Sequence, residues 1–303
     1  MPLNALSVDL EDYFQVSNFD HVVDRSHWDA QPRRVLENAR RLLDAFDSQG
    51  VRSTFFVLGW IAEREPALVR EIADRGHEIA CHGYGHELVY ELGREAFSND
   101  IRRARQAIED ACGSRVRGYR APSYSITAQS LWALDVLAEQ GFDYDSSIFP
   151  IRHHRYGIPD FPRHPQRLSL PEGGTIEEFP MTTWRFGGTN LPWAGGAYLR
   201  FLPPAVFRWG FRSLTRRGEP TVLYLHPWEI DPDQPRQDVS FPIRINHYWR
   251  LSRTLPRLQR LMDEHSFAPL AQVLDELRQA GSLPELAWPS GDDATSGVVA
   301  ASA

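Results

Sequence analysis

Carboxylates and imidazoles follow several short apolar segments of this chain. Asp9, Glu11 and Asp12 lie within SVDLEDYF, and His82 and His86 lie four residues apart within CHGYGHE. Residues two apart on a strand face the same side, so Asp9 and Glu11 should point together, whereas Asp12 depends on where the strand ends. A helical turn would bring the two histidines together. Two neutral imidazoles and one carboxylate form a three-ligand site for a divalent cation such as Zn²⁺, with positions open for water and substrate.

Three further polar side chains also come at predicted strand ends: Arg120 in RGYRAPS, Asp145 in DYDSS and His226 in VLYLH. A fixed guanidinium can hold a carboxylate ionised by bidentate hydrogen bonding. His226 can act as a general acid, with Asp145 orienting it. The ordinary alternatives are a surface salt bridge for Arg120 and a structural role for His226.

The basic residues exclude several kinds of catalysis. All 33 basic residues are arginine, because the 303-residue sequence contains no lysine. Schiff-base chemistry, a pyridoxal phosphate anchor and a Walker-type phosphate loop are therefore ruled out. The net charge of −7 gives no general reason to bind nucleic acid.

The sequence also suggests a cellular location. Cys81 and Cys112 lie far apart, which favours reduced thiols in the cytosol. The N-terminal MPLNALSVDLEDYF lacks the features of a signal peptide, and no apolar run is long enough for a transmembrane helix. The sequence therefore predicts a cytoplasmic protein. Action at the inner membrane face, in peripheral association with a membrane assembly system, is a further hypothesis.

Apolar runs that alternate with amphipathic ones predict the elements that position these residues. Five βα-like steps precede residue 150, which favours a parallel α/β barrel whose strand ends converge on a site. The predicted strands lie at 3–8, 53–59, 77–81, 115–120 and 142–146, and the helices at 32–48, 65–74, 95–111 and 127–140. After residue 200 we expect strands at 221–226 and 266–270 and helices at 248–264 and 271–279.

The middle of the chain, residues 151–200, is rich in Pro, Gly, His and Trp and predicts a functional loop layer with one strand near 176–179. Its aromatic residues can stack on sugar rings or simply pack in the core. The aromatic candidates there and beyond it are Trp184, Trp193, Tyr198, Trp228 and Trp249. Residues 288–303 are small and polar, and we expect them to be disordered.

Taken in order, SVDLED, STFFVLG, CHGYGH, RGYRAPS, DYDSS and LYLHP resemble the polysaccharide deacetylase family, carbohydrate esterase family four. The resemblance covers about residues 3–230. VDLEDYFQV, YDSSIFP, GGAYLRFLP and HPWEID resemble more narrowly the branch linked to exosortase and exopolysaccharide loci, which carries an added C-terminal region. The fold implied is a distorted (β/α)7-type barrel in one domain over 1–287, with a core of about 3–230, a long loop-rich insertion and a C-terminal extension of about 231–287.

The activity implied is metal-dependent removal of N-acetyl groups from amino sugars of a polysaccharide or its oligosaccharide precursor, with release of acetate. The roles implied are catalytic base for Asp9, metal binding for His82 and His86, bracing of the base for Arg120, and general acid for His226. Asp145 would partner the acid, and Glu11 or Asp12 would be the third metal ligand, with the same-face geometry favouring Glu11. A backbone N–H at Ser123 or Tyr124 would stabilise the oxyanion, and Trp228 would contact substrate.

The sequence departs from the family pattern at three points. The usual adjacent aspartates are spread into Asp-Leu-Glu-Asp, Gly83 replaces a hydroxyl residue after the first histidine, and Ser123 stands where many members have an aromatic residue. Two other functions stay open. One is hydrolysis of a small amide or an O-acetyl ester, and the other is a catalytically silent carbohydrate-binding protein.

Overall fold

The fold is built on one large, mainly parallel sheet. In the computed structural model, which describes residues 4–287, ten strands form a sheet in the order β10-β1-β2-β3-β4-β5-β7-β6-β12, with β11 pairing to β1. The strands are β1 (Asn4–Leu10), β2 (Thr54–Val57), β3 (Glu78–Cys81), β4 (Gly118–Tyr119), β5 (Tyr144–Asp145), β6 (Gln166–Ser169), β7 (Thr175–Glu178), β10 (Val222–Leu225), β11 (Phe267–Ala268) and β12 (Glu285–Ala287). Only the β6–β7 pair of this sheet is antiparallel.

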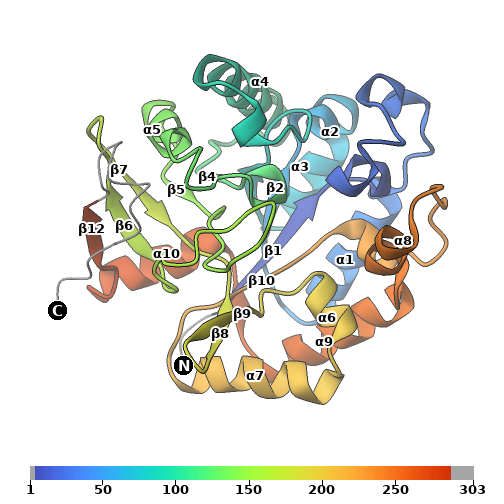
Figure 1. Cartoon of the computed structure of the whole chain (residues 1–303). Helices are drawn as coiled ribbons and strands as arrows, with labels where there is room; N and C mark the ends of the chain where they lie inside the picture. The colour runs from blue at the N-terminus through green and yellow to red at the C-terminus, as the bar shows by residue number, and fades with distance from the viewer. Residues whose placement is uncertain (1–3, 288–303) are drawn as a thin grey trace.

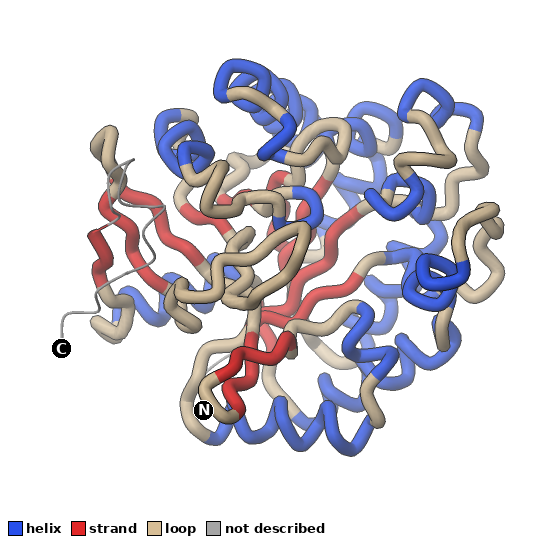
Figure 2. The backbone as a smooth tube through the Cα atoms, viewed as in Figure 1, coloured by secondary structure: helices blue, strands red, loops and turns tan. Residues whose placement is uncertain are grey.

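Helices cover the outside of the curved sheet, as Figures 1 and 2 show. The α-helices are α1 (Val35–Ser48), α2 (Gly59–Arg64), α3 (Pro66–Asp74), α4 (Arg94–Cys112), α5 (Trp132–Glu139), α6 (Ala197–Phe201), α7 (Pro204–Arg216), α8 (Phe241–Tyr248), α9 (Thr254–Glu264) and α10 (Leu270–Gln279). The predicted α/β class with a parallel sheet is thereby confirmed. The strands at the two ends of the sheet, β10 and β12, do not pair with each other, so the described strands do not close into a barrel.

Strand β1 lies between β10 and β2 and determines where the site can form. Leu6, Val8 and Leu10 pack into the core beneath the helices. Ala5 belongs to the apolar cluster on the other face of the sheet. Because successive strand side chains alternate between faces, Asp9 also points to this inner face, at the carboxyl end of the strand.

The middle of the chain is more ordered than the sequence predicts. Besides β7, where one strand is expected, it contains β6 and a separate two-stranded hairpin of β8 (Thr183–Phe186) and β9 (Thr189–Pro192). Helices α6 and α7 then follow, where no helix is predicted. In α7, Phe207, Phe211 and Leu214 are buried at helical spacing, so the amphipathic pattern is present, but it lies between proline- and glycine-rich stretches.

The predicted helix at 248–264 begins later, at Thr254 as α9, and α8 (Phe241–Tyr248) lies where no helix is predicted. Helix α8 ends at Tyr248, and the backbone then turns at Arg250, whose φ of 54° is left-handed, before α9 begins at Thr254. A residue in the left-handed region cannot continue a right-handed helix. The disordered tail predicted for 288–303 lies outside the described residues. The single-domain assignment of residues 1–287 stays a prediction.

Candidate active site

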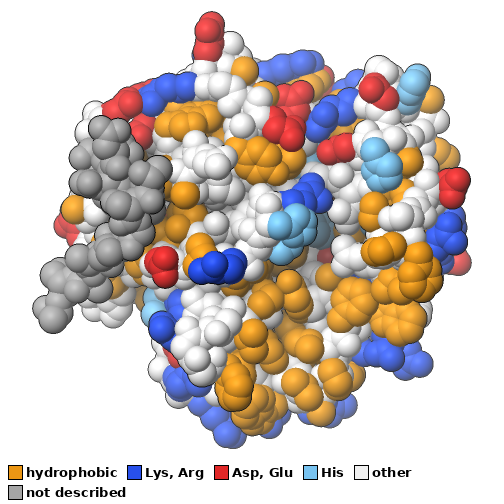
Figure 3. All heavy atoms as spheres, in the orientation of Figure 1, with side chains coloured by type: hydrophobic (Ala, Val, Ile, Leu, Met, Phe, Trp, Pro, Cys, Tyr) orange, Lys and Arg blue, Asp and Glu red, His pale blue; other side chains and the backbone are white. Residues whose placement is uncertain are grey.

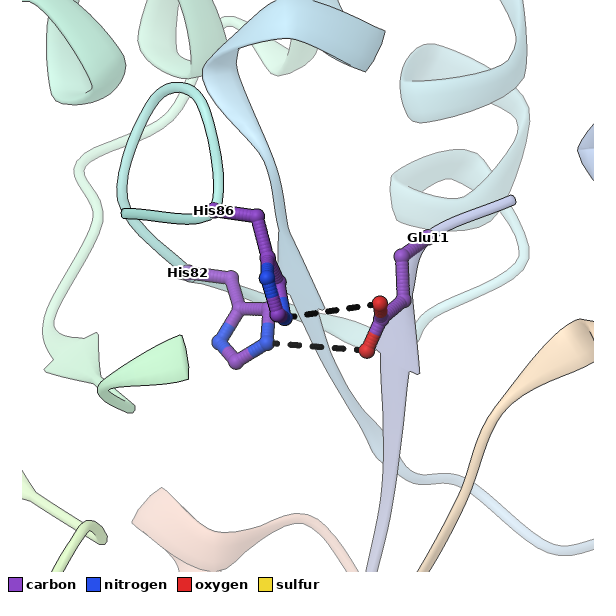
Figure 4. A group of neighbouring side chains, drawn as sticks. All are labelled: Glu11, His82 and His86. Carbon is purple, nitrogen blue, oxygen red and sulfur yellow. Dashed lines mark ion pairs between the residues drawn. The ribbon is translucent and has the colours of Figure 1, made fainter. Parts of the chain in front are cut away.

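A buried cluster of Glu11, His82 and His86 lies where β1 and β3 end. Glu11 follows the last residue of β1, and His82 follows the last residue of β3. The side chains of all three are at most 3% exposed, and their ligand atoms lie within 4.8 Å of one another. His86 Nε2 is 3.5 Å from Glu11 Oε2, and His82 Nε2 is 3.9 Å from Glu11 Oε1 (Figure 4).

A tight loop, rather than the helical turn that the four-residue spacing would allow, brings the two histidines together. Gly83 has a φ of 74° and His86 a φ of 55°. The main chain is held in place where Gly59 N donates to Gly83 O at 2.9 Å and Tyr84 N donates to Asp100 Oδ2 at 3.0 Å. Gly83 is suited to this turn because its left-handed conformation would strain most other residues.

The donor set fits a divalent cation. His82 Nδ1 donates to the carbonyl of Arg120 at 2.8 Å, which leaves Nε2 as a lone-pair donor facing Glu11. Glu11 Oε2 and His86 Nδ1 are buried without a hydrogen-bond partner among the described residues. Burial lowers the pKa of both histidines, to about 4 for His86. Neutral imidazoles facing a carboxylate are the ligand set that Zn²⁺ prefers.

Glu11 is ionised despite its burial. Burial alone would raise its pKa, but His86, His226 and His82 outweigh that effect and lower it to about 2. His226 contributes at close range, because its Nε2 lies 3.0 Å from Glu11 Oε1. Glu11 therefore presents a full negative charge to the cluster.

Asp12, the alternative third ligand, serves another purpose. Its Oδ1 accepts from Tyr13 N at 2.9 Å, and its Oδ2 accepts from Arg34 N at 2.7 Å and Val35 N at 3.0 Å. These bonds cap a short 3-10 turn and the start of α1. Because both carboxylate oxygens are committed to backbone amides, the structure places Asp12 outside the candidate metal cluster and supports Glu11.

Asp9 and Arg120 form a buried ion pair beside the cluster. Arg120 Nη1 donates to Asp9 Oδ1 at 2.7 Å and to Ser7 Oγ at 2.8 Å. The rest of the guanidinium donates to Ser146, with Nε to the carbonyl at 3.1 Å and Nη2 to the hydroxyl at 3.0 Å. Arg120 is 0% exposed. It therefore fixes one oxygen of Asp9 and leaves the other, Oδ2, facing His226 Nε2 at 3.9 Å.

The partner of His226 is Glu229, and the assignment of Asp145 to this role is wrong. His226 Nδ1 lies 2.8 Å from Glu229 Oε1, and Glu229 Oε2 accepts from Arg200 Nε at 2.8 Å. Arg200 is also buried and donates to the carbonyls of Asn246, His247 and Trp249. Burial alone would lower the pKa of His226, but Glu11 and then Glu229 raise it to about 10.

Asp145 is the last residue of β5 and is fully buried. Its oxygens accept from Ser147 Oγ at 2.6 Å and Ser147 N at 3.0 Å. Burial and then the neighbouring Asp145 raise the pKa of Glu178 well above its usual range. Since like-charged carboxyls in contact cannot both be ionised at low cost, these two residues form a shared-proton pair rather than a partner for His226.

Glu229 and Arg200 are functional residues that sequence reasoning missed. Glu229 lies at the third position of a 3-10 turn (Pro227–Ile230) that His226 caps, and it accepts from His226 N at 3.2 Å. A glutamate three residues after a helix-capping residue is a recognisable sequence signal. Arg200 gives no comparable signal, because it comes from the loop layer and reaches the site only through the fold.

The cleft next to the cluster has a volume of about 640 Å³, and the acidic, basic and histidine side chains described above that line it are Asp9, Glu11, His82, His86, Arg200, His226 and Glu229. Ser123, Tyr124 and Trp228 also border it, together with His153 and Tyr156 from the loop layer. The Tyr124 amide already donates to the Ala121 carbonyl at 3.0 Å, which leaves the Ser123 amide as the candidate oxyanion donor.

The predicted sugar-stacking aromatics divide into two groups. Tyr198 and Trp228 line the cleft, and Trp228 stacks on His226 with ring centroids 5.0 Å apart. Trp193 is only 4% exposed, stacks on Phe207 and donates to the Phe207 carbonyl, so it belongs to the core. Trp184 packs against Trp193 and away from the cleft lining. Trp249 is 44% exposed and is not part of the cleft lining.

Solved structures share this fold. A protein from Mycobacterium smegmatis classed with the polysaccharide deacetylases superposes with a TM-score of 0.63 at 22% identity, covering 96% of each chain. An allantoinase superposes with a TM-score of 0.58 at 14% identity, covering 92% of this chain and 91% of its own. At such identities the likeness shows a shared fold alone.

Sequence comparison identifies the family. Residues 26–144 match the family described as polysaccharide deacetylase, and residues 146–275 match a domain of unknown function, DUF3473. A Bacillus cereus peptidoglycan-N-acetylglucosamine deacetylase is 31% identical over 101 residues, which cover 33% of this chain and 37% of the relative. A Sinorhizobium fredii chitooligosaccharide deacetylase is 35% identical over 97 residues, which cover 32% and 42%. Residues 26–144 of the chain therefore match the polysaccharide deacetylase family, and the chain spans less than half the length of these relatives.

Proposed function

We propose that this protein is a metal-dependent hydrolase that removes N-acetyl groups from amino sugars of an oligosaccharide or polysaccharide and releases acetate. The observation that carries the proposal is the placement of a braced carboxylate, Asp9, and a carboxylate-held histidine, His226, beside one three-ligand cluster. The relatives named above, which act on peptidoglycan and chitooligosaccharides, support the substrate class.

Glu11, His82 and His86 would hold the cation, and their two imidazole nitrogens and one carboxylate suit Zn²⁺. When bound there, a divalent cation supplies Lewis-acid polarisation and lowers the pKa of water. The protein's own residues would carry out the proton transfers and stabilise the oxyanion. Arg120 fixes Asp9 Oδ1 and leaves Oδ2 facing the cleft, where it would accept a proton from the attacking water.

His226 completes the reaction on the leaving group. Glu229 accepts a hydrogen bond from His226 Nδ1–H, so Nε2 is the nitrogen that faces the cleft. As the water oxygen bonds to the acetyl carbon and the C–N bond breaks, Nε2 gives its proton to the departing amine. The Ser123 amide would stabilise the negative oxygen that forms on the carbonyl. The products are acetate and a free amino sugar.

The cleft favours an oligosaccharide over a very small amide. Its volume of about 640 Å³ and its aromatic border at Tyr156, Tyr198 and Trp228 suit several sugar rings. The described residues include no helix that is long and apolar enough to cross a membrane. The branch linked to exopolysaccharide loci and the cytoplasmic location remain predictions.

The test is acetate release from defined N-acetylated oligosaccharides. Asp9→Asn and the His82→Ala, His86→Ala pair should abolish release, and a chelator should remove it until a divalent metal is restored. Asp74→Asn, at an exposed position on α3, is the matched control and should behave as wild type. Undiminished activity in the double histidine variant would refute the metal site.

A panel with O-acetyl esters and small amides separates the alternative hydrolases. Oligosaccharide binding without release from any of these substrates would indicate a silent binding protein.

A further inference from the structure

A second cavity lies outside the catalytic cleft, between α6, α7 and α9, and its volume is about 420 Å³. Its apolar floor includes Leu199, Phe207 and Leu261. No acidic side chain lines it. Its polar lining is entirely arginine: Arg208, Arg250, Arg253, Arg257 and Arg260.

Most of this positive charge has no counter-charge. Glu264 alone pairs with Arg208 at 3.1 Å and with Arg260 at 3.3 Å. Arg250, Arg253 and Arg257 form no ion pair with a carboxylate within residues 4–287. Guanidinium groups gathered without carboxylates are typical of sites for phosphate or another oxyanion.

One of these arginines, Arg257, is held in place by backbone carbonyls, and Arg250 lies near an aromatic ring. Arg257 Nη1 donates to the carbonyls of Leu199 at 2.5 Å and Arg200 at 2.9 Å, near the end of α6. Burial, and then repulsion from Arg250 and Arg253, lowers the pKa of Arg257. The Arg250 guanidinium lies 5.2 Å from the ring centre of Trp249. The fold thus maintains a repulsive arrangement that an anion would relieve.

Exposed apolar side chains stand beside the cavity. Phe201, Val206 and Trp249 are 37%, 42% and 44% exposed, and each lies within two residues of one that lines the cavity. Figure 3 shows hydrophobic side chains gathered on the lower part of this face, with basic ones at its edge. Arginines and aromatic residues together are the side chains that favour the interface of a bilayer.

We propose that this arginine pocket binds the phosphate of an anionic lipid headgroup and so docks the protein on a bilayer surface. A free phosphate would need the charges but not the apolar floor and rim, which suit the glycerol and acyl region next to a headgroup. The chain as a whole carries a net charge of −7, so attraction to an anionic surface requires a local patch of this kind.

Docking would bring the bilayer close to the catalytic cleft. Helix α6 supplies Leu199 to the arginine pocket and Tyr198 and Arg200 to the cleft. The bound surface would therefore lie on the other side of a single helix from the cleft. This placement suits a substrate that is itself held at a membrane, and the lipid site does not depend on the deacetylase activity.

The test uses the full chain and sucrose-loaded vesicles, either of phosphatidylcholine alone or mixed with phosphatidylglycerol. The wild type should sediment with the mixed vesicles only. Arg250→Gln with Arg253→Gln should lower the partition coefficient about 30-fold, since each arginine near a surface contributes about a fivefold factor. The control pair, Arg102→Gln with Arg185→Gln, changes the net charge equally at exposed positions elsewhere and should bind as wild type.

Each outcome decides the proposal. An equal loss of vesicle binding in both double variants would show general charge attraction and would overturn the proposed lipid site. Binding of the wild type to neither kind of vesicle would also overturn it. Titration with inorganic pyrophosphate distinguishes a lipid headgroup from a free phosphate compound as the ligand. Tight binding of pyrophosphate without vesicle binding would overturn the lipid assignment. Thermal melting checks folding, and Arg253→Gln alone, with an expected fivefold loss, keeps the test valid if the double variant is unstable.

Discussion

Replacing Glu229 by glutamine tests how the structure activates His226. The carboxylate lies 2.8 Å from His226 Nδ1, and both side chains are largely buried. The variant keeps the size and one acceptor oxygen but removes the negative charge. Coulomb's law at an effective dielectric constant of about 20 gives about 6 kcal/mol at this separation. If the neutral amide retains half of that energy, the stabilisation of the His226 imidazolium falls by about 3 kcal/mol. The rate of a step that depends on the imidazolium would then fall about 10²-fold.

The same change also tests stability, because Glu229 is the only carboxylate on the buried Arg200 within the described residues. Removing one partner of a buried pair costs about 3–5 kcal/mol when the other is left alone. Arg200 keeps its bonds to three carbonyls, so we expect a loss near the lower limit. Thermal or urea unfolding measures it, and kinetics should be run well below the midpoint.

The assay compares two leaving groups. Deacetylation of an N-acetyl sugar expels a poor leaving group that needs a proton, whereas an aryl acetate ester expels a good one that does not. Glu229→Gln should lower kcat about 10²-fold on the amide and much less on the ester. Asp145→Asn, which the structure places away from His226, should not show this difference. Equal losses on both substrates for Glu229→Gln, in a folded protein, would refute the general-acid role.

Three other expected outcomes rest on single side chains. Arg120→Gln should lower kcat about 10²–10³-fold with little change in KM, because Asp9 loses its brace; an unchanged kcat would contradict the pairing. Glu11→Gln should lose bound metal in elemental analysis, whereas Asp12→Asn should keep metal but unfold at lower urea; the reverse pattern would make Asp12 the ligand. Burial lowers the pKa of His77 to about 4. As the pH falls below about 6.5, His77 is therefore protonated in the unfolded chain before it is protonated in the folded protein. The free energy of unfolding should fall by about 3 kcal/mol between pH ~6.5 and pH 4. Urea midpoints of His77→Gln across that range should fall less, and parallel curves would refute the assignment.

The parts of the site that could be predicted from sequence are those that a strand positions. Asp9, His82 and His226 each stand at or just past an apolar run, and the carboxyl ends of parallel strands share one edge. Strand alternation also explains why Glu11 follows Asp9 into the cleft and why the neighbouring Asp12 turns away to cap a helix. The periodicity that predicts the strand therefore also predicts on which face of the sheet its polar side chains lie.

The parts that could not be predicted depend on tertiary contact. Asp145 does stand at a strand end, but its neighbour in space is Glu178, which comes from a strand that returns after a long loop. Arg200 belongs to a segment that reads as loop, and its role arises only because α6 packs against the turn that contains Glu229. No local pattern encodes such pairings, since they are set by how separate elements pack.

These contacts bear on the part played by residues 146–275, which match a domain of unknown function. That region supplies β10, which pairs with β1 in parallel register from Ala5 to Val8. It also supplies His226, Glu229 and Arg200, whereas His82 and Arg120 come from the region that matches the deacetylase family. His82 follows β3 and His226 follows β10, and both strands belong to the same sheet as β1. Residues 146–275 are therefore part of the candidate site rather than an appendage to it.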